Sequence, residues 1–175
     1  VECSITAVAA NKGVYMLICG TGKNMDKCRS LVKELGCEDR IIFAGYRYDA
    51  KELLHGADAF IFPSRREGLG LAAIEAMAAG LPLIVSDNRG TREYAVNGEN
   101  AIVCEYNNIS QFINAVQLLS TDTELCRKLG ENGYRTAEKY GLENALKCMA
   151  DIYRSYIDIP ADSKTEVLSG EDKKV

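Results

Sequence analysis

Short apolar runs alternate with helical patterns along most of this 175-residue chain. Such alternation is typical of right-handed β-α-β units, in which parallel strands form a sheet covered by helices on both faces. The sequence therefore predicts an α/β fold with a doubly wound parallel sheet. Strands are expected near 14–19, 41–44, 58–62, 83–86 and 101–103, and helices near 2–10, 24–36, 49–55, 70–79, 109–119, 122–139 and 143–157.

Composition limits the kinds of partner that the chain can have. Hydrophobic residues make up 47% of it, which is enough for one compact core, and the net charge of −4 gives no general attraction to nucleic acid or anionic lipid. No basic patch with interleaved aromatics occurs, no apolar run is long enough to cross a bilayer, and no signal peptide is present. We expect a cytoplasmic domain with no nucleic-acid partner and no transmembrane segment.

The cysteine pattern argues against a metal centre and against a disulfide scaffold. The seven cysteines are odd in number, widely separated and without a C-x-x-C pair, and no Asp-x-Asp motif is visible. We expect reduced thiols, no metal site and no cofactor.

The segment from Pro63 to Pro82 carries the clearest chemical signal. A short apolar run ends at Phe62-Pro-Ser64, a loop follows, and a helical pattern begins near Gly70. Because glycine has no β-carbon, a phosphate could approach the backbone closely at a helix end whose free N–H groups favour anions. The predicted phosphate site consists of the amides of Gly68, Leu69, Gly70 and Leu71.

Two glutamates flank this predicted phosphate site. Glu67 precedes it and Glu75 follows about two helical turns later, so they are too far apart to share one proton or one metal ion. They could accept hydrogen bonds from hydroxyls at two ends of one extended ligand. The alternative for either residue alone is structural: Glu67 as a loop carboxylate near a helix N-terminus, and Glu75 as a solvated helix residue.

Other candidate residues also follow predicted strands, where ligands gather in doubly wound sheets. They are Gly20 and Gly22, Tyr46 and Arg47, and the segment from Asp87 to Gly90. Gly20-Thr-Gly-Lys23 has neither the spacing of a nucleotide-triphosphate loop nor the third glycine of a dinucleotide fingerprint. A tight strand-to-helix turn is the favoured interpretation there.

Five charged or titratable residues near these segments have open roles. His55 is interpreted as structural, at the end of a helix. Arg65, Arg66, Arg89 and Arg92 could pair with phosphate, but surface arginines are more often solvated or salt-bridged.

Taken together, these motifs resemble the retaining nucleotide-sugar glycosyltransferases of family 4 (group 1), which carry an E-x7-E signature in the C-terminal half of a GT-B fold. The resemblance covers about residues 3 to 157, and the run Asp87–Glu93 is similar to members that serve bacterial capsule or exopolysaccharide synthesis. It implies a Rossmann-like domain. The matching segments are Val14–Cys19 with Gly20-Thr-Gly22, Arg40–Gly45, Phe62-Pro-Ser64, Pro82–Asp87 with Gly90 and Glu93, and Asn97–Val103.

The resemblance also implies roles for the candidate residues. The amides of Gly68 to Leu71 would hold the donor diphosphate, Glu75 the ribose hydroxyls, and Glu67 the donor sugar as the catalytic residue. The backbone around Tyr46 and Arg47 would contact the base, and Gly20 and Gly22 match the family's turn, where Lys23 replaces a common proline. The implied reaction is metal-independent transfer of a sugar to an acceptor hydroxyl with retained anomeric configuration.

The chain departs from the family pattern at its front. The family's C-terminal half opens with a strand that bears an arginine and then a lysine, and Val1 lies after that point. We therefore expect a donor-binding domain over residues 1–157 that lacks its first strand, a mobile tail over 158–175, and a missing N-terminal acceptor domain. The fragment alone would be inactive, and the missing half could lie against the inner face of the membrane.

The main alternative is a noncatalytic nucleotide-sugar binding or scaffold module that acts with a partner chain. A GT-B epimerase or phosphorylase shares the architecture but is less favoured, because a phosphorylase should show its pyridoxal-binding lysine context and epimerases lack the helix sequence found here. The apolar residues of the helix at 143–157 could face the missing half, a second copy or the local core.

Overall fold

The computed structural model describes residues 1–157, so the tail predicted over 158–175 lies outside the described residues. The described residues fall into two units, the first over Val1–Glu138 and the second from Lys139 onward. Within residues 1–157, no helix is both long enough and apolar enough to cross a membrane.

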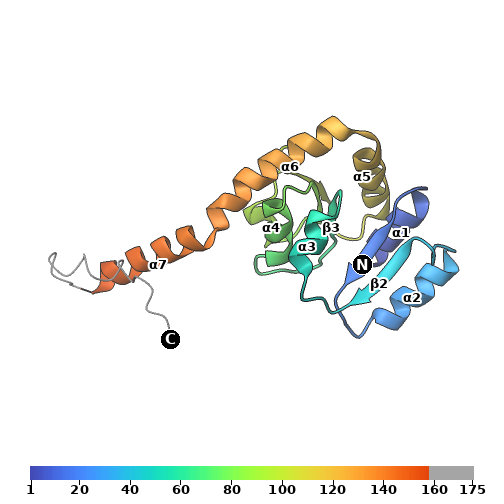
Figure 1. Cartoon of the computed structure of the whole chain (residues 1–175), viewed down its shortest axis with the longest axis horizontal. Helices are drawn as coiled ribbons and strands as arrows, with labels where there is room; N and C mark the ends of the chain where they lie inside the picture. Colours follow the sequence, from blue (N-terminus) through green and yellow to red (C-terminus); the bar gives the residue numbers. More distant parts are fainter. Residues whose placement is uncertain (158–175) are drawn as a thin grey trace. The chain divides into compact units, whose positions relative to one another are not determined.

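The alternation of strands and helices predicted from the sequence is confirmed (Figure 1). Each expected element occurs within a few residues of its predicted bounds. The strands are β1 (Met16–Cys19), β2 (Ile41–Gly45), β3 (Phe60–Phe62), β4 (Leu83–Ser86) and β5 (Ala101–Cys104). The α-helices are α1 (Glu2–Ala10), α2 (Met25–Glu34), α3 (Ala50–His55), α4 (Leu71–Ala78), α5 (Ile109–Thr121), α6 (Thr123–Ala137) and α7 (Leu142–Tyr156), with 3-10 turns at Thr91–Glu93 and Glu138–Tyr140.

All pairings between these strands are parallel, as expected, but the strands form two sheets rather than one continuous sheet. β1 pairs with β2, and β3, β4 and β5 pair in that order. Phe60 lies opposite Leu83, and Leu83 lies opposite Ala101. This register aligns the carboxyl ends of β3 and β4, where the candidate residues lie. The strands are divided into two sheets because no described strand pairs with the second edge of β1 or of β3.

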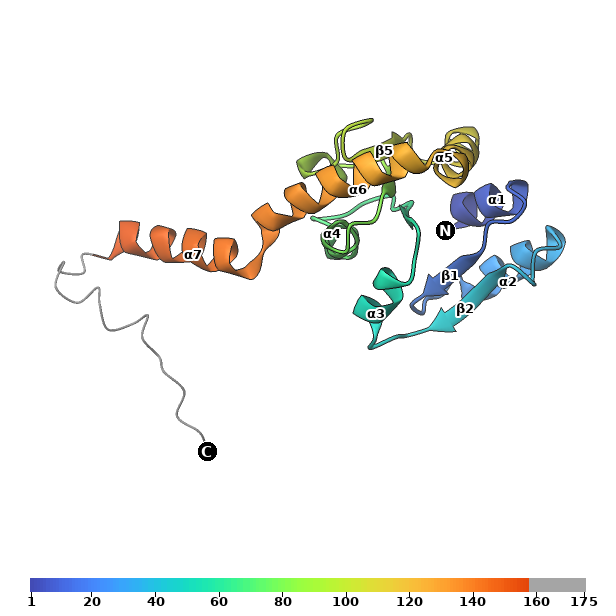
Figure 2. The same ribbon diagram turned by 45° about the horizontal axis from the view of Figure 1, so that its top comes forward.

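Helix α1 contributes to the hydrophobic cores of both sheets. Ile5 and Val8 pack in a cluster with Ile41 of β2, whereas Ala7 packs in a second cluster with Ile84 of β4 and Phe112 of α5. In Figure 2, α1 lies between α5 and the β1–β2 pair. The helix is apolar on more than one side because it is covered on more than one side.

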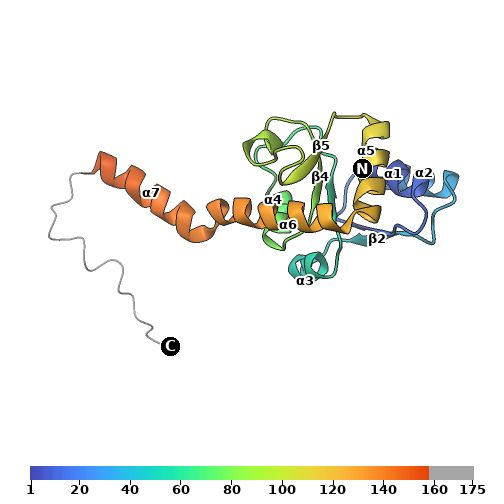
Figure 3. The ribbon, with the colours of Figure 1, turned by 90° about the horizontal axis from the view of Figure 1, so that it is seen from above.

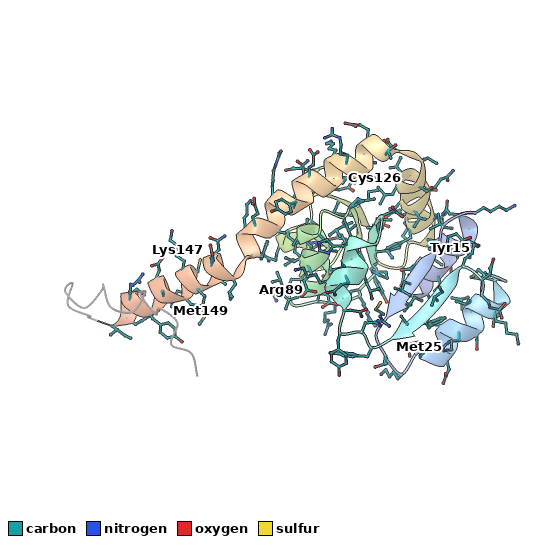
Figure 4. All side chains as sticks on the ribbon, in the orientation of Figure 1. Tyr15, Met25, Arg89, Cys126, Lys147 and Met149 are labelled. Carbon is teal, nitrogen blue, oxygen red and sulfur yellow. The ribbon has the colours of Figure 1, made fainter. Side chains whose placement is uncertain are left out.

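Helix α7 belongs to the second unit, and none of its residues is buried. Lys147 and Met149 project from opposite sides of it (Figure 4). Its apolar stripe is more than half exposed and consists of Leu142, Leu146, Met149, Ile152 and Tyr153.

Helices α4 and α6 lie side by side (Figure 3) and approach most closely at a glycine. Gly130 of α6 is buried, and a β-carbon added there would overlap the carbonyl oxygen of Gly80, which follows α4. Gly133, one turn later, is also buried, but its added β-carbon would lie 3.5 Å from the Met77 side chain, an ordinary contact. Gly130 therefore sets how closely the two helices pack.

We predict that Gly130→Ala destabilises the protein by about 2 kcal/mol, because overpacking against backbone outweighs the gain in helix propensity. Gly133→Ala is the matched control and should be neutral or stabilise by up to about 1 kcal/mol. Denaturant unfolding of both variants measures the difference. Equal stabilities would contradict the close helix contact at Gly130.

Candidate functional site

The loop from β3 to α4 ends at position 70, where the backbone conformation and the close neighbours permit only glycine. Gly70 has a φ of +85° in the left-handed region and is the N-cap of α4, which begins at Leu71 as the sequence predicted. A β-carbon there would lie 2.9 Å from the Phe62 ring and 3.2 Å from the hydroxyl of Tyr94. The backbone thus turns sharply at Gly70, close to Phe62 at the end of β3.

This turn leaves a row of backbone donors available. Among the described residues, no backbone or side-chain acceptor is hydrogen-bonded to the N–H groups from Gly68 to Ala72, and the first α4 bonds run from Ala73 and Ile74 to the Gly70 carbonyl. The position beside Gly68 is open, since a β-carbon there would meet nothing within 4 Å. Free N–H groups at a helix N-terminus attract anions. The amides that the sequence predicts as a phosphate site are therefore free to donate to a ligand.

The two glutamates occupy different surroundings on either side of these donors. Glu67 is half-buried, and its Oε1 accepts a 2.6 Å hydrogen bond from the Ser64 hydroxyl. Glu75 is exposed on α4 and lines a hollow of about 450 Å³ together with Lys51 and His55 of α3. Within residues 1–157, no three metal-ligating side chains come together. The two carboxylates thus differ in exposure and in hydrogen bonding.

The candidates on β1 and β2 form a second group. The Gly20 amide donates a 2.6 Å hydrogen bond to the Gly45 carbonyl, which places the Gly20–Gly22 turn beside Tyr46. Arg47 forms a bidentate pair with Asp49. The hydrogen bond from Arg47 lowers the pKa of the Asp49 carboxyl below its ordinary value.

Tyr46 and Tyr48 meet edge to face, with ring centroids 5.0 Å apart, and both are largely exposed. They lie in the loop that leads into α3. Helix α3, which follows this loop, lines the hollow together with Glu75 of α4. Within residues 1–157, no hydrogen bond joins the candidates on β1 and β2 to the β3–α4 loop.

The structure assigns partners to some of the basic residues whose roles the sequence left open. Arg92 pairs with Asp87, and their hydrogen bond lowers the pKa of the Asp87 carboxyl below its ordinary value. Arg65, Arg66 and the labelled Arg89 (Figure 4) are exposed and form no ion pair within residues 1–157.

His55 lies at the end of α3, where its Nδ1 is 2.7 Å from the Lys51 carbonyl oxygen. The helix-end position predicted for it is confirmed.

Sequence reasoning missed a group of polar side chains beneath the β3–α4 loop. Ser86, Asn88 and Thr91, here called the β4 polar cluster, are buried at the carboxyl end of β4. Ser86 and Asn88 donate to the carbonyl of Ser64, so the cluster joins the two loops that follow β3 and β4. The position of these polar residues directly after a buried strand could have indicated the cluster, but nothing in the sequence indicates that Ser64 is their partner.

A comparison with protein families decides what kind of protein this is. The family model described as "Glycosyl transferases group 1" matches residues 1–136, which is more than half of the chain. The chain belongs to this family. Sugar transfer is therefore the activity class of its family, and the resemblance seen in the sequence is confirmed at that level.

Curated relatives of this glycosyltransferase chain include two bacterial proteins. The protein EpsD of Bacillus subtilis, named as a glycosyltransferase, is 35% identical over 150 residues, covering 86% of this chain and 39% of EpsD. The lipopolysaccharide core biosynthesis glycosyltransferase LpsE of Rhizobium meliloti is 31% identical over 132 residues, covering 75% of this chain and 39% of LpsE. The chain thus spans about two-fifths of the length of these relatives.

Solved structures agree on the fold. The sucrose-phosphate synthase of Thermosynechococcus elongatus is 27% identical with a TM-score of 0.80, covering 89% of this chain and 41% of that one. Anabaena HepE, solved in complex with UDP-glucose, is 22% identical with a TM-score of 0.83, covering 88% of this chain and 44% of HepE. The predicted Rossmann-like α/β class is confirmed, and the structural neighbours are GT-B glycosyltransferases.

We predict that Gly70→Ala destabilises the chain by about 2–3 kcal/mol, since it adds left-handed strain to an overlap with Phe62. Gly68→Ala, two residues earlier in open space, should change stability by less than about 0.5 kcal/mol. Thermal and denaturant unfolding distinguish the two. A Gly70→Ala variant as stable as Gly68→Ala would show that the turn into α4 is not fixed as described.

Proposed function

We propose that this chain is the C-terminal, nucleotide-sugar binding half of a retaining glycosyltransferase that transfers a sugar from a nucleotide diphosphate donor to an acceptor hydroxyl. The observation that carries the proposal is the row of free amides from Gly68 to Ala72, placed between Glu67 and Glu75. A nucleotide sugar presents the matching groups in the same order: sugar hydroxyls, a diphosphate and ribose hydroxyls.

The diphosphate fits the N-terminus of α4. Its oxygens would accept from the free amides, and the helix dipole adds favourable charge. The same donors would stabilise the negative charge that develops on the leaving diphosphate, which preorganised N–H groups achieve without a metal ion. Metal-independent transfer is part of the proposal.

The two carboxylates would bind opposite ends of the donor. Glu75 lines the hollow between α3 and α4, where it can accept hydrogen bonds from ribose hydroxyls. Glu67 lies before the amides, where the sugar would extend, and it acts as the residue that contacts the transferred sugar. The hydrogen-bonded turns at Gly20–Gly22 and Gly45–Arg47 would contact the base through their backbones.

We further propose that a preceding strand completes the sheet between β1 and β3. Both strands have one unpaired edge among residues 1–157, and α1 packs against the cores of both sheets. A strand that leads into α1 would complete a right-handed β-α-β unit with β1.

The acceptor domain of the proposed enzyme would lie outside this chain, which spans about two-fifths of its relatives. LpsE is named for lipopolysaccharide core biosynthesis, and this name favours a role in surface polysaccharide synthesis for the proposed enzyme. We propose a cytoplasmic location for this step, where nucleotide sugars are made, with any membrane association supplied by the acceptor half.

Calorimetric titration with UDP, GDP and ADP tests the donor site. We predict that one nucleotide binds equally well with magnesium and with EDTA, and that Glu75→Ala weakens its binding about tenfold or more, because hydrogen bonds to a charged group are lost. Glu52→Ala, an exposed glutamate on α3 outside the lining of the hollow, is the matched control. Absence of binding at millimolar nucleotide, or strict magnesium dependence, would contradict the proposal.

We also predict that the 175-residue chain alone binds donor but transfers no sugar, because transfer needs an acceptor site that the chain does not supply. Product formation from the bound nucleotide sugar, followed by mass spectrometry, measures this. The full-length protein with the same donor is the positive control. Turnover by the purified chain would refute the assignment to one half of an enzyme.

A further inference from the structure

The orientation of Glu67 depends on a neighbour three residues earlier in the same loop. Ser64 donates a 2.6 Å hydrogen bond from Oγ to Oε1 of Glu67. Both residues are half-buried, and Ser64 is the donor that reaches this carboxylate among the described residues. A hydrogen bond of this length to a charged acceptor is strong enough to select one side-chain rotamer.

Ser64 is itself held in place through its backbone. Its carbonyl oxygen accepts two hydrogen bonds, one from the Ser86 hydroxyl and one of 3.1 Å from Nδ2 of Asn88. Both donors are buried. The backbone of Ser64 is therefore held by two buried side chains, and its hydroxyl donates to Glu67.

The β4 polar cluster is in turn closed by its own hydrogen bonds. Oδ1 of Asn88 accepts from the amides of Gly90 and Thr91, at 3.0 and 3.1 Å. The Thr91 hydroxyl donates to the Ser86 carbonyl at 2.8 Å. Buried polar groups that are all satisfied form a rigid support, whereas partly satisfied ones do not.

The turn at Gly90 lies close to the backbone and Cβ of Glu67. A β-carbon at Gly90 would lie 2.9 Å from the Cβ and carbonyl oxygen of Glu67 and from the carbonyl oxygen of Gly68. The two loops are therefore in close contact at Gly90, which leaves no room for a side chain there. The close contact with Gly90 and the hydrogen bond from Ser64 both restrict Glu67.

We infer that Ser64 is a positioning residue: supported by the β4 polar cluster, it holds the Glu67 carboxylate in the orientation that receives the donor sugar. The inference rests on the proposed function, since it concerns the sugar end of that site. Ser64 does not contact the diphosphate or the ribose in this arrangement. Its effect is therefore confined to the part of binding that the sugar adds.

The readout is the ratio of two dissociation constants, that of the nucleotide diphosphate divided by that of the corresponding nucleotide sugar, measured by calorimetry on the 175-residue chain. Ser64→Ala should lower this ratio about tenfold, while the dissociation constant of the nucleotide diphosphate stays within about twofold. Ser64→Thr keeps the hydroxyl and should restore the ratio. Thermal unfolding of each variant shows whether the fold is retained.

A double-mutant cycle with Glu67→Gln tests whether Ser64 acts through Glu67. Glu67→Gln should itself lower the ratio, and adding Ser64→Ala to it should lower the ratio no further, because the carboxylate to be held is gone. Independent multiplicative effects, or an unchanged ratio in Ser64→Ala, would overturn the inference. A purely structural role would lower the melting temperature and weaken both ligands equally, which would overturn it too.

These outcomes are separate from failure of the proposed function. If the unmodified chain binds neither nucleotide diphosphate nor nucleotide sugar, the donor site itself is refuted. If both bind and Glu67→Gln lowers the ratio while Ser64→Ala does not, the donor site stands and only the positioning role fails.

Discussion

The parallel pairing of β3 with β4 is the constraint on which the candidate site depends. It aligns the carboxyl ends of the two strands, so that Ser86 and Asn88 reach the carbonyl of Ser64. These hydrogen bonds fix the start of the loop that carries Glu67, and Gly70 fixes its end. The free amides at the start of α4 follow directly from this fixed loop. Without the strand register, the same residues would form an unsupported surface loop.

Backbone groups supply much of the chemistry of this site, and glycine is the residue that permits it. At Gly70 the left-handed φ and the closeness of Phe62 exclude a side chain, and at Gly90 the Glu67–Gly68 backbone does so. The charged side chains of Glu67 and Glu75 lie before and after the free amides at the start of α4. This division suits a long ligand with a charged centre and hydroxyls at both ends.

The two sheets share a core element without sharing a strand. Helix α1 is covered on one side by the β1–β2 cluster and on another by the β4–α5 cluster. The open edges of β1 and β3 are backbone donors and acceptors that a further parallel strand would satisfy. Parallel strands in α/β proteins are normally buried on both sides, as β4 is, and the partial exposure of β1 and β3 fits their position at an edge.

Local patterns in the sequence determined the elements and much of the candidate site. Apolar runs and helical periodicity predicted the strands and α-helices found within residues 1–157, and the glycines before Leu71 marked the start of α4. These features depend on neighbours close in the chain, so periodicity and residue type suffice to find them. The tertiary structure alone decided that the strands fall into two sheets, that Arg92 pairs with Asp87, and that Asn88 holds Ser64 from 24 residues away. Such contacts arise from the register of paired strands and from burial, which no local pattern encodes.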